Sequence, residues 1–499
     1  ETLKTPEQIK AHQDKMRTFF KTNIGGFPER TPLNAQVMGG GKKENFRYEK
    51  IIYESQLGYY VTATLFLPLT EGPYPGILMP CGHSAIGKAY ESYQRACILL
   101  AMHGFATLCY DPVGQGERFY PYGEEGKQVG ATIEHTLLNG GAIPTGANVS
   151  MYRIWDGMRG LDYLESRKDI KSDKLGVTGN SGGGTLTSFL MSLDDRVYVA
   201  APSCYLTDYR TLIKDSGPHD GEQNIFNGIA FGMNHPDFLH MRAPKPTLMC
   251  TATRDFFNIN GTWDTYREAK RLYTRLGYAE RVDLIETDST HGYSIELREG
   301  MVRWMKRWVM GIDEPVFEPD FEILTLEEMQ CTQSGNVAEL PNAKSAFDLN
   351  RERAEALAVG RGKPTVAAVR ELIVAKAFED ISTPPSWKVS TDDMKQSWYL
   401  KSEEGIYLPL DLYLPEGDVK SVMVVVHEQG KTAVTPEHMA AVAKDGYAVC
   451  AVDLRGYGET KTTDTRWEDT VGGVWCDYTR AFLLGKSFVG MRSDDVGST

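Results

Sequence analysis

The sequence predicts an α/β protein in which helices cover both faces of a mostly parallel sheet, followed by a second, incomplete segment of the same class. Three observations lead to this prediction. Apolar, β-branched runs alternate with helical patterns from residue 46 to residue 310, as in parallel sheets with helical crossovers. A glycine-rich turn joins a strand to a helix within residues 174–193. Part of this unit recurs near the end of the chain at a constant offset.

Composition and charge describe an ordinary globular protein that is acidic overall. Its 499 residues suffice for two or three domains, and 41% of them are hydrophobic. The formal net charge of −13 argues against nucleic acid or an anionic membrane as a partner, since either requires a basic face. No apolar run approaches the ~20 residues that span a bilayer. The first residues lack the apolar core of a signal peptide, and the missing initiator Met suggests processing.

Nothing in the sequence indicates a metal or a cofactor. The eight cysteines are scattered, with no C-x-x-C pair and no spacing typical of metal ligands, and several fall in predicted strands. We expect them to be buried thiols. The glycines of residues 111–117 fit neither a P-loop nor a dinucleotide fingerprint and indicate a structural turn.

The elements of the first unit are predicted from capping signals and apolar periodicity. Thr5, Pro6 and Gln8 combine a capping box with a proline at the first helical position, which predicts a helix to about Thr22. Strands are predicted at 46–55, 59–67, 76–80, 105–110, 175–178, 197–201, 246–252 and 281–286. Helices are predicted at 90–103, 151–166, 185–193, 262–276 and 294–310. The segment before residue 151 and the segment 204–241 are expected to be long loops, the latter a lid or substrate wall.

This order divides the chain into four parts. Residues 1–45 form an N-terminal helical extension, and residues 46–312 form the complete α/β domain. Residues 313–397 are expected to be a linker, acidic and proline-bearing at 313–335, with helices at 344–361 and 365–378. Residues 398–499 form an incomplete copy of the α/β domain.

The copy is identified by residues that match at fixed distances. Residues 453–459 (DLRGYGE) are identical to residues 111–117 (DPVGQGE) at four of seven positions, 342 residues apart. The pair Arg492 and Asp495 matches Arg153 and Asp156, 339 residues apart. Continuing this offset would put a second nucleophile turn beyond the last residue given, so the copy is expected to lack a nucleophile, an acid and a base. Either the natural chain continues past residue 499, or another surface or a second subunit covers the open sheet edge; the latter would make the protein a homo-oligomer.

The turn at residues 179–183 carries the strongest chemical signal. It reads Gly-Asn-Ser-Gly-Gly between a predicted strand and a predicted helix, which is the context that the G-x-S-x-G nucleophile elbow requires. Glycines let the strand and helix approach each other while the Ser181 hydroxyl stays exposed. The alternative interpretation is a glycine-rich connection whose serine has no catalytic role.

A nucleophilic serine needs a base that is oriented by a carboxylate. In this sheet type both partners follow later strands, in the order Ser, Asp, His. Asp255 follows the strand at 246–252 and His291 follows the strand at 281–286, so Ser181, Asp255 and His291 are the expected catalytic residues. The competing residues fit less well: Asp264 starts a helix, Asp288 lies beside the histidine loop, and His219, His235 and His240 precede the acid.

Other residues are expected to surround this triad. The N–H groups of Gly182 and His83 are the expected oxyanion hole. Trp263, Phe256, Tyr205 and Glu222 are the expected substrate-binding residues. For the aromatic residues, stacking on a sugar ring and packing in the core are about equally compatible with the sequence.

Residues 46–310 resemble the α/β-hydrolase superfamily, and more closely its bacterial acetyl xylan esterase-like and dienelactone hydrolase-like branch. The residues that carry the resemblance are 81–84, 111–117, the elbow at 179–183, 253–255, and His291 with Gly292. The resemblance implies hydrolysis of esters on acyl-decorated plant or algal polysaccharide, by proteins often exported to the periplasm or beyond. The GNSGG elbow differs from the GCSRxGK pattern of glucuronoyl esterases, which disfavours that activity.

Three functions therefore remain open. The first is a serine carboxylic ester hydrolase acting on carbohydrate esters. The second is a serine peptidase of the prolyl-oligopeptidase type, although no β-propeller repeat precedes the hydrolase unit. The third is a hydrolase-fold binding protein without activity, which the complete set of serine, histidine and aspartate disfavours.

Overall fold

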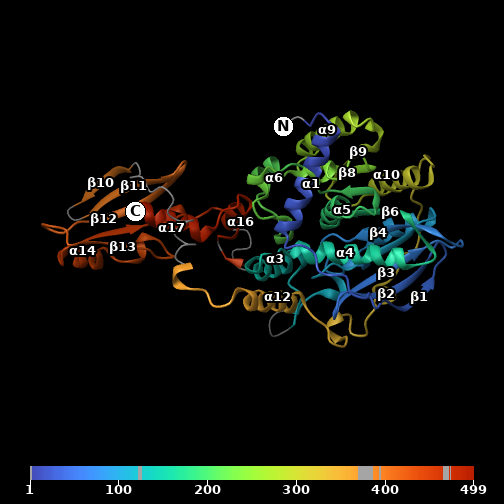
Figure 1. The fold of residues 1–499 in the computed structure, drawn as a ribbon, viewed down its shortest axis with the longest axis horizontal. Coiled ribbons are helices and arrows are strands. Elements are labelled where there is room, and N and C mark those ends of the chain that lie inside the picture. The colour runs from blue at the N-terminus through green and yellow to red at the C-terminus, as the bar shows by residue number, and fades with distance from the viewer. Residues whose placement is uncertain (1–2, 122–125, 369–385, 393–394, 465–470, 473) are drawn as a thin grey trace. The chain divides into compact units, whose positions relative to one another are not determined.

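The computed structural model describes residues 3–121, 126–368, 386–392, 395–464, 471–472 and 474–499. The chain divides into two compact units, residues 1–358 and 359–499. Each unit contains one sheet (Figure 1).

A nine-stranded sheet organises the first unit, in the order β1-β2-β3-β5-β4-β6-β7-β8-β9. Strands β1, β2, β3 and β5 pair antiparallel to one another, and all pairs from β5 to β9 are parallel. The strands are β1 (Gln36–Lys42), β2 (Arg47–Gln56), β3 (Tyr59–Leu67), β4 (Tyr74–Pro80), β5 (Ala106–Tyr110), β6 (Ile170–Asn180), β7 (Val197–Ser203), β8 (Thr247–Arg254) and β9 (Val282–Thr290). The predicted mostly parallel sheet is confirmed.

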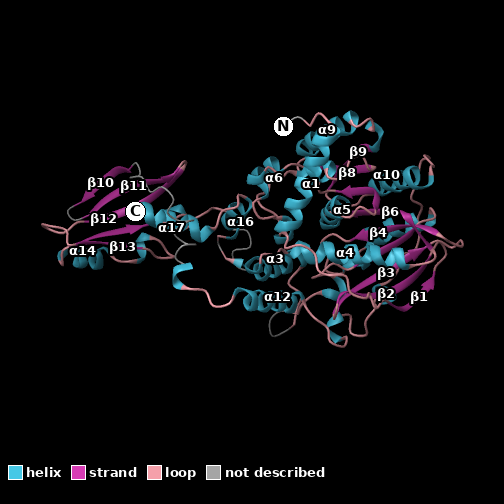
Figure 2. Cartoon of the chain, in the orientation of Figure 1, coloured by secondary structure: helices cyan, strands magenta, loops and turns pink. Residues whose placement is uncertain are grey.

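Helices cover both faces of this sheet (Figure 2). The helices of the first unit are α1 (Pro6–Asn23), α2 (Glu91–Met102), α3 (Ala131–Ala142), α4 (Val149–Ser166), α5 (Gly182–Leu193), α6 (Tyr209–Asp215), α7 (Gly228–Phe231), α8 (His235–His240), α9 (Ile259–Arg275), α10 (Ile295–Met305), α11 (Leu326–Met329) and α12 (Ala346–Arg361). One apolar core contains side chains of α4, α5 and α9, and a second contains side chains of α2 and α10. Successive strand side chains alternate between them: Leu78 of β4 lies in the first core, and Ile77 and Met79 lie in the second.

The N-terminal helix α1 begins as predicted and packs on the first unit. Thr5 and Gln8 form the capping box. Phe20 is buried against Phe189 of α5, with ring centroids 4.9 Å apart. The residues expected to form a separate extension thus share the core of the α/β domain.

Three segments of the first unit differ from the expectation. Strand β1 was not predicted, because its glycine-rich run has no apolar alternation and every one of its residues is exposed. Helix α3 forms within a segment expected to be a loop, since polar residues on its buried side obscure the apolar period. Residues 313–335, expected to be a linker, instead bury Val316, Phe321 and Leu324 in the core beside α2 and α10. The helix predicted at 365–378 lies largely outside the described residues.

The second unit repeats the first half of the first sheet. Its elements are β10 (Ser386–Asp392), β11 (Lys395–Glu403), β12 (Ile406–Tyr413), β13 (Ser421–Val425), α14 (Pro436–Lys444), β14 (Tyr447–Val452), α16 (Trp475–Leu483) and α17 (Phe488–Ser498). The order β10-β11-β12-β14-β13 corresponds to β1-β2-β3-β5-β4, with the same antiparallel and parallel pairs. The sequence repeat therefore corresponds to a structural repeat.

Candidate active site

The turn between β6 and α5 holds Ser181 in a strained conformation. Strand β6 ends at Asn180, α5 begins at Gly182, and Ser181 between them has φ 60° and ψ −125°. A positive φ is uncommon for a residue with a Cβ and costs on the order of 1–3 kcal/mol. The Ser181 N–H donates to Ser203 O at 2.9 Å, and its carbonyl accepts from Thr185 N–H at 2.9 Å. The strain is held in place by β7 on one side and α5 on the other.

Two glycines allow the start of α5 to lie against the loop that follows β4. A Cβ on Gly183 would be 2.3 Å from Pro80 O, and a Cβ on Gly182 would be 2.8 Å from the His83 ring. Neither position accommodates a side chain, because both contacts are far shorter than van der Waals distance. The first N–H groups of α5 have no partner within the helix and carry its positive dipole end. The loop that carries His83 therefore lies beside these donors and the serine.

Ser181, His291 and Asp255 form one hydrogen-bonded chain. His291 Nε2 lies 2.8 Å from Ser181 Oγ. His291 Nδ1 lies 2.8 and 2.9 Å from the two carboxylate oxygens of Asp255. The side chain of Asp255 is buried, and that of His291 is partly exposed. Because a carboxylate can only accept, Nδ1 carries a proton, which leaves the Nε2 lone pair free to accept the serine proton.

The side chain of His83 belongs to a buried charged cluster. His83 Nε2 lies 2.7 Å from Glu222 Oε1, and Glu222 comes from the short turn Gly221–Gln223 in the predicted lid. Arg153 of α4 donates to the same oxygen at 2.6 Å, and His135 Nδ1 of α3 lies 3.1 Å from it. We call Glu222, His83, His135 and Arg153 the Glu222 cluster. It connects α3, α4, the lid segment and the loop beside Ser181.

Electrostatics keep Glu222 ionised in this cluster. Burial alone would raise the pKa of Glu222, but His135, Arg153 and His83 outweigh burial and hold that pKa well below its ordinary value. The neighbouring Asp220 behaves oppositely: burial, reinforced by Glu222, raises its pKa to about 6 although His83 opposes the shift. Glu222 is therefore the permanent negative charge of the cluster.

The chain is similar to proteins named as hydrolases and esterases. The chain is 25% identical over 304 residues to a Bacillus subtilis (strain 168) protein named "Putative hydrolase YtaP", covering 57% of this chain and 96% of that protein. Among solved structures, Methylesterase BT1017 superposes with a TM-score of 0.57 at 21% identity, over 70% of this chain and 77% of that one. The first unit has the α/β-hydrolase fold. A putative acetyl xylan esterase from Bacteroides fragilis NCTC 9343 has a TM-score of 0.47 at 16% identity, covering 57% of this chain and 76% of its own. No protein-family profile matches the chain.

In this α/β-hydrolase fold, the loop that carries Asp255 and the loop that carries His291 each begin where a parallel strand ends. Asp255 follows β8 directly, and His291 follows β9 directly. The carboxyl ends of β6, β8 and β9 share one edge of the sheet, because these strands are parallel. The order of the chain and the direction of the strands together bring the three side chains within hydrogen-bond distance.

The four residues expected to bind substrate lie in different environments. Phe256 is 52% exposed, and its ring centroid is 4.2 Å from that of His291, so it borders the site. Tyr205 is buried among core aromatic rings, including Phe189 and Phe257. Trp263 lies on α9 and donates from Nε1 to Glu286 Oε2 of β9 at 2.9 Å. Glu222 is buried in its cluster. We retain a substrate contact as an expectation for Phe256 alone.

Three groups of described residues have donor atoms close enough together to hold a metal ion. They are His12 with Asp237 and His240, His83 with His135 and Glu222, and Cys204 with Asp255 and His291. In the second group Arg153 already donates to Glu222 at 2.6 Å, so a cation there would lie beside a guanidinium. In the third group, Asp255 and His291 already hydrogen-bond to each other.

Sequence reasoning missed the parts of the Glu222 cluster that come from helices. Arg153 was noticed only through its match to Arg492, and His135 lay in a segment expected to be a loop. The available signal was the occurrence of charged residues within otherwise apolar helical segments, which indicates buried ion pairs.

Among the described residues, no helix combines the length and apolar character needed to cross a membrane.

Proposed function

We propose that this protein is a serine carboxylic ester hydrolase acting on carbohydrate esters, with Ser181 as nucleophile, His291 as base and Asp255 as its orienting carboxylate. The protein hydrolyses ester bonds through these three side chains. The observation that carries the proposal is the continuous chain of hydrogen bonds from Asp255 through His291 to Ser181 Oγ, with the serine on a strained turn at a helix start.

The reaction proceeds in two steps, acylation of Ser181 by the ester and hydrolysis of the acyl-enzyme by water. Ser181 Oγ attacks the ester carbonyl as His291 Nε2 takes its proton, and the carbonyl oxygen becomes an oxyanion. Collapse breaks the bond to the alcohol oxygen, which receives the proton from His291, and leaves an acyl group on Ser181. Water then attacks this acyl-enzyme, giving its proton to His291, and the second collapse returns that proton to Ser181 and releases the carboxylic acid.

The N–H groups of Gly182 and His83 are proposed to stabilise the oxyanion. Gly182 is the first residue of α5, where N–H groups lack helical acceptors. The loop carrying His83 lies against it. Donors fixed before the reaction lower the barrier without reorganisation, and one such donor is worth about 10²–10³ in kcat.

Support for an ester substrate comes from two sources. Methylesterase BT1017 is named for an ester-cleaving activity and shares the fold, and the motifs at 81–84 and 179–183 resemble those of acetyl xylan esterases. Phe256 beside His291 offers an exposed ring on which a sugar could stack. A polysaccharide substrate also suits export to the periplasm or beyond, which we include in the proposal.

The test compares ester and amide hydrolysis. Wild type should hydrolyse p-nitrophenyl acetate, and Ser181→Ala and His291→Ala should each lower kcat by on the order of 10⁴ while remaining folded. Ser84→Ala, a serine in the neighbouring loop, serves as the matched control and should retain activity. A Ser181→Ala variant with near-wild-type esterase activity would overturn the assignment. Faster cleavage of a proline-based amide would favour the peptidase, and no turnover of either substrate would favour a binding protein.

A further inference from the structure

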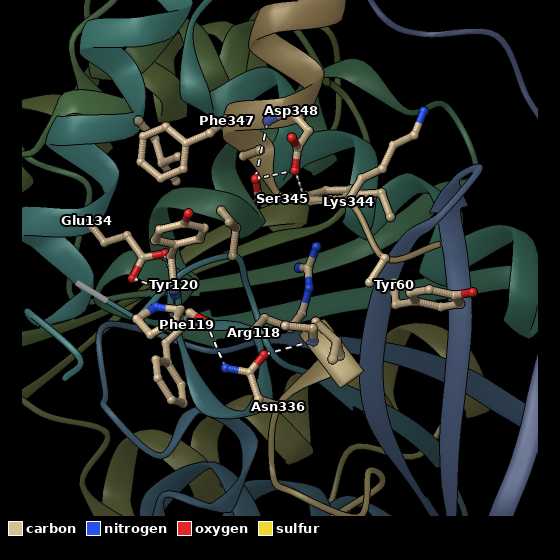
Figure 3. A pocket seen from close by; sticks show the side chains of 18 residues that line it. Tyr60, Arg118, Phe119, Tyr120, Glu134, Asn336, Lys344, Ser345, Phe347 and Asp348 are labelled. Atoms are coloured by element: carbon tan, nitrogen blue, oxygen red, sulfur yellow. Dashed lines mark hydrogen bonds between the residues drawn. The ribbon is translucent and has the colours of Figure 1, made fainter. Parts of the chain in front are cut away.

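A cavity of about 310 Å³ lies in the first unit, apart from Ser181 and its partners (Figure 3). Its walls come from the start of β3, the segment 113–121, α3, and the segment 336–348 that leads into α12. We call it the Arg118 pocket. None of the catalytic residues proposed above is among its lining residues.

Two buried donors of this pocket have no partner in the described part of the chain. Arg118 Nη1 donates to Asp156 Oδ2 at 2.7 Å and to Asp111 O at 3.0 Å, whereas its Nη2 makes no hydrogen bond. The Tyr59 hydroxyl is likewise without a partner. Arg118 is 5% exposed and Tyr59 3%, and the guanidinium lies 4.8 Å from the Tyr59 ring centroid. Buried polar groups are almost always hydrogen-bonded, so two unpaired groups in one pocket call for an acceptor.

Glu134 lines the same pocket without adding a charge at neutral pH. Its two carboxyl oxygens accept from the Tyr120 N–H at 3.0 and 3.2 Å. Burial raises the pKa of Glu134 to about 8, against the opposing effects of Tyr120 and Arg118. At neutral pH the carboxyl group is therefore mostly protonated and uncharged.

The charged groups of the pocket are already balanced. Arg118 is paired with Asp156 at 2.7 Å. Lys344 is paired with Glu352 at 2.8 Å, and Asp348 with Arg351 at 3.1 Å. A charged ligand would leave one charge uncompensated in a poorly hydrated site, which is costly. The ligand that fits is uncharged and presents hydrogen-bond acceptors.

The remaining walls are apolar and aromatic. Val113, Phe119, Leu138 and Phe347 line the pocket. Figure 3 shows the Arg118 guanidinium reaching toward the middle of the labelled side chains. We propose that the Arg118 pocket is a second ligand site, which binds a small uncharged molecule with an apolar ring and a carbonyl oxygen that accepts from Arg118 Nη2 and the Tyr59 hydroxyl.

Three probes of similar shape separate the possible ligand classes. Acetophenone carries a ring and a carbonyl, benzoate carries a charge, and ethylbenzene has no acceptor. Binding is measured at pH 7 by ligand-observed NMR on the full-length Ser181→Ala variant, so that no probe reacts. We expect acetophenone to bind at least about tenfold more tightly than either other probe, because each unpaired buried donor gains a partner. Equal binding of acetophenone and ethylbenzene would overturn the proposal, and tighter binding of benzoate would overturn its uncharged class.

Variants assign the binding to this pocket. Tyr59→Phe removes one donor that has no partner in the folded protein, so it should leave the melting temperature unchanged and weaken acetophenone about tenfold. Ala343→Trp places a ring into the pocket and should abolish binding. Glu134→Gln keeps an uncharged group at that position and should bind like the parent. Unchanged affinity in both Tyr59→Phe and Ala343→Trp would show that acetophenone binds elsewhere and would overturn the proposal.

Discussion

His83 Nε2 and Glu222 Oε1 lie 2.7 Å apart, although the two residues are 139 positions apart in the chain. This contact ties the loop beside Ser181 to the lid segment. Glu222 also accepts from Arg153 at 2.6 Å, so its position is fixed from the opposite side. We infer that Glu222 is a positioning residue, which holds the His83 loop so that its N–H faces the developing oxyanion.

The first prediction follows from this role. Glu222→Gln keeps an oxygen acceptor but removes the negative charge that His83, His135 and Arg153 share, so the His83 loop should lose its fixed position. We expect kcat on p-nitrophenyl acetate to fall about 10- to 100-fold with KM nearly unchanged, since the lost donor acts mainly in the transition state.

A matched control separates positioning from general stability. Asp156→Asn also removes a buried carboxylate that is paired with an arginine, here Arg118, but in a different cluster. Both variants should lower the melting temperature, and only Glu222→Gln should lower kcat when assayed well below it. Equal losses of kcat in the two variants would show that Glu222 has no specific role.

The second prediction concerns a motif that occurs in both units. Lys88 Nζ lies 2.6 Å from Asp111 and 2.7 Å from Glu117, all three buried. In the second unit Lys431 contacts Asp453 and Glu459 in the same arrangement, but Glu459 is 58% exposed on its side chain. Lys88→Met leaves two buried carboxylates unpaired and should cost about 3–5 kcal/mol of unfolding free energy. Lys431→Met should cost clearly less, because solvent can hydrate Glu459.

Differential scanning calorimetry checks this pair of variants. Lys88→Met should lower the transition of the first unit, and Lys431→Met should leave that transition and the esterase activity unchanged. Equal destabilisation by both substitutions would contradict the prediction, because the loss of unfolding free energy would then not depend on the exposure of Glu459.

The motif also shows what the sequence could and could not predict. The repeat of residues 111–117 at 453–459 predicted a shared structural turn, and Asp111 is indeed buried and accepts from Thr62 Oγ1 and Lys88. The lysine that completes each cluster was not predicted, because it lies 23 positions before Asp111 and 22 before Asp453, with no local pattern. Local signals of this kind predict strands, caps and the elbow, whose causes lie within a few residues.

Long-range partners explain the remaining errors. Glu222 was expected at the substrate, yet it is buried, and Arg153, 69 positions away, compensates its burial. Residues 313–335 were expected to be a linker because the segment is acidic and contains prolines, yet Phe321 and Leu324 are buried. In both cases a few contacts with distant elements decided the outcome, and no sequence window contains them.

The third prediction concerns pH. Burial raises the pKa of Glu134 to about 8, so between the ordinary value of about 4.3 and pH 8 the folded state keeps a proton that the unfolded state releases. The contribution of Glu134 to stability is therefore complete below about pH 4 and declines as pH rises toward 8, by at most about 1.4 kcal/mol per pH unit. Glu134→Gln should remove this decline. The check is the difference in melting temperature between wild type and Glu134→Gln from pH 5 to 8.5, and a difference that does not change with pH would contradict the prediction.

The fourth prediction concerns the edge of the second sheet. Strand β13 pairs with β14 alone among the described residues, whereas its counterpart β4 pairs with both β5 and β6. Val422 on β13 is 62% exposed and Met423 41%. An exposed apolar edge strand promotes pairing with another chain. We therefore expect this 499-residue chain to self-associate through β13, which is one of the ways of covering the open edge that the incomplete repeat allows.

Light scattering coupled to gel filtration tests for self-association, because it measures the mass of the particle, which is 55.7 kDa for a monomer. The double variant Val422→Lys and Met423→Lys places a charge on each face of the edge strand and should shift the chain to monomer. Val359→Lys is the matched control, because Val359 is equally apolar and 87% exposed but lies on α12. It should leave the oligomer intact. A wild-type chain that is monomeric at every concentration tested, or an oligomer that survives the double substitution, would rule out β13 as the contact.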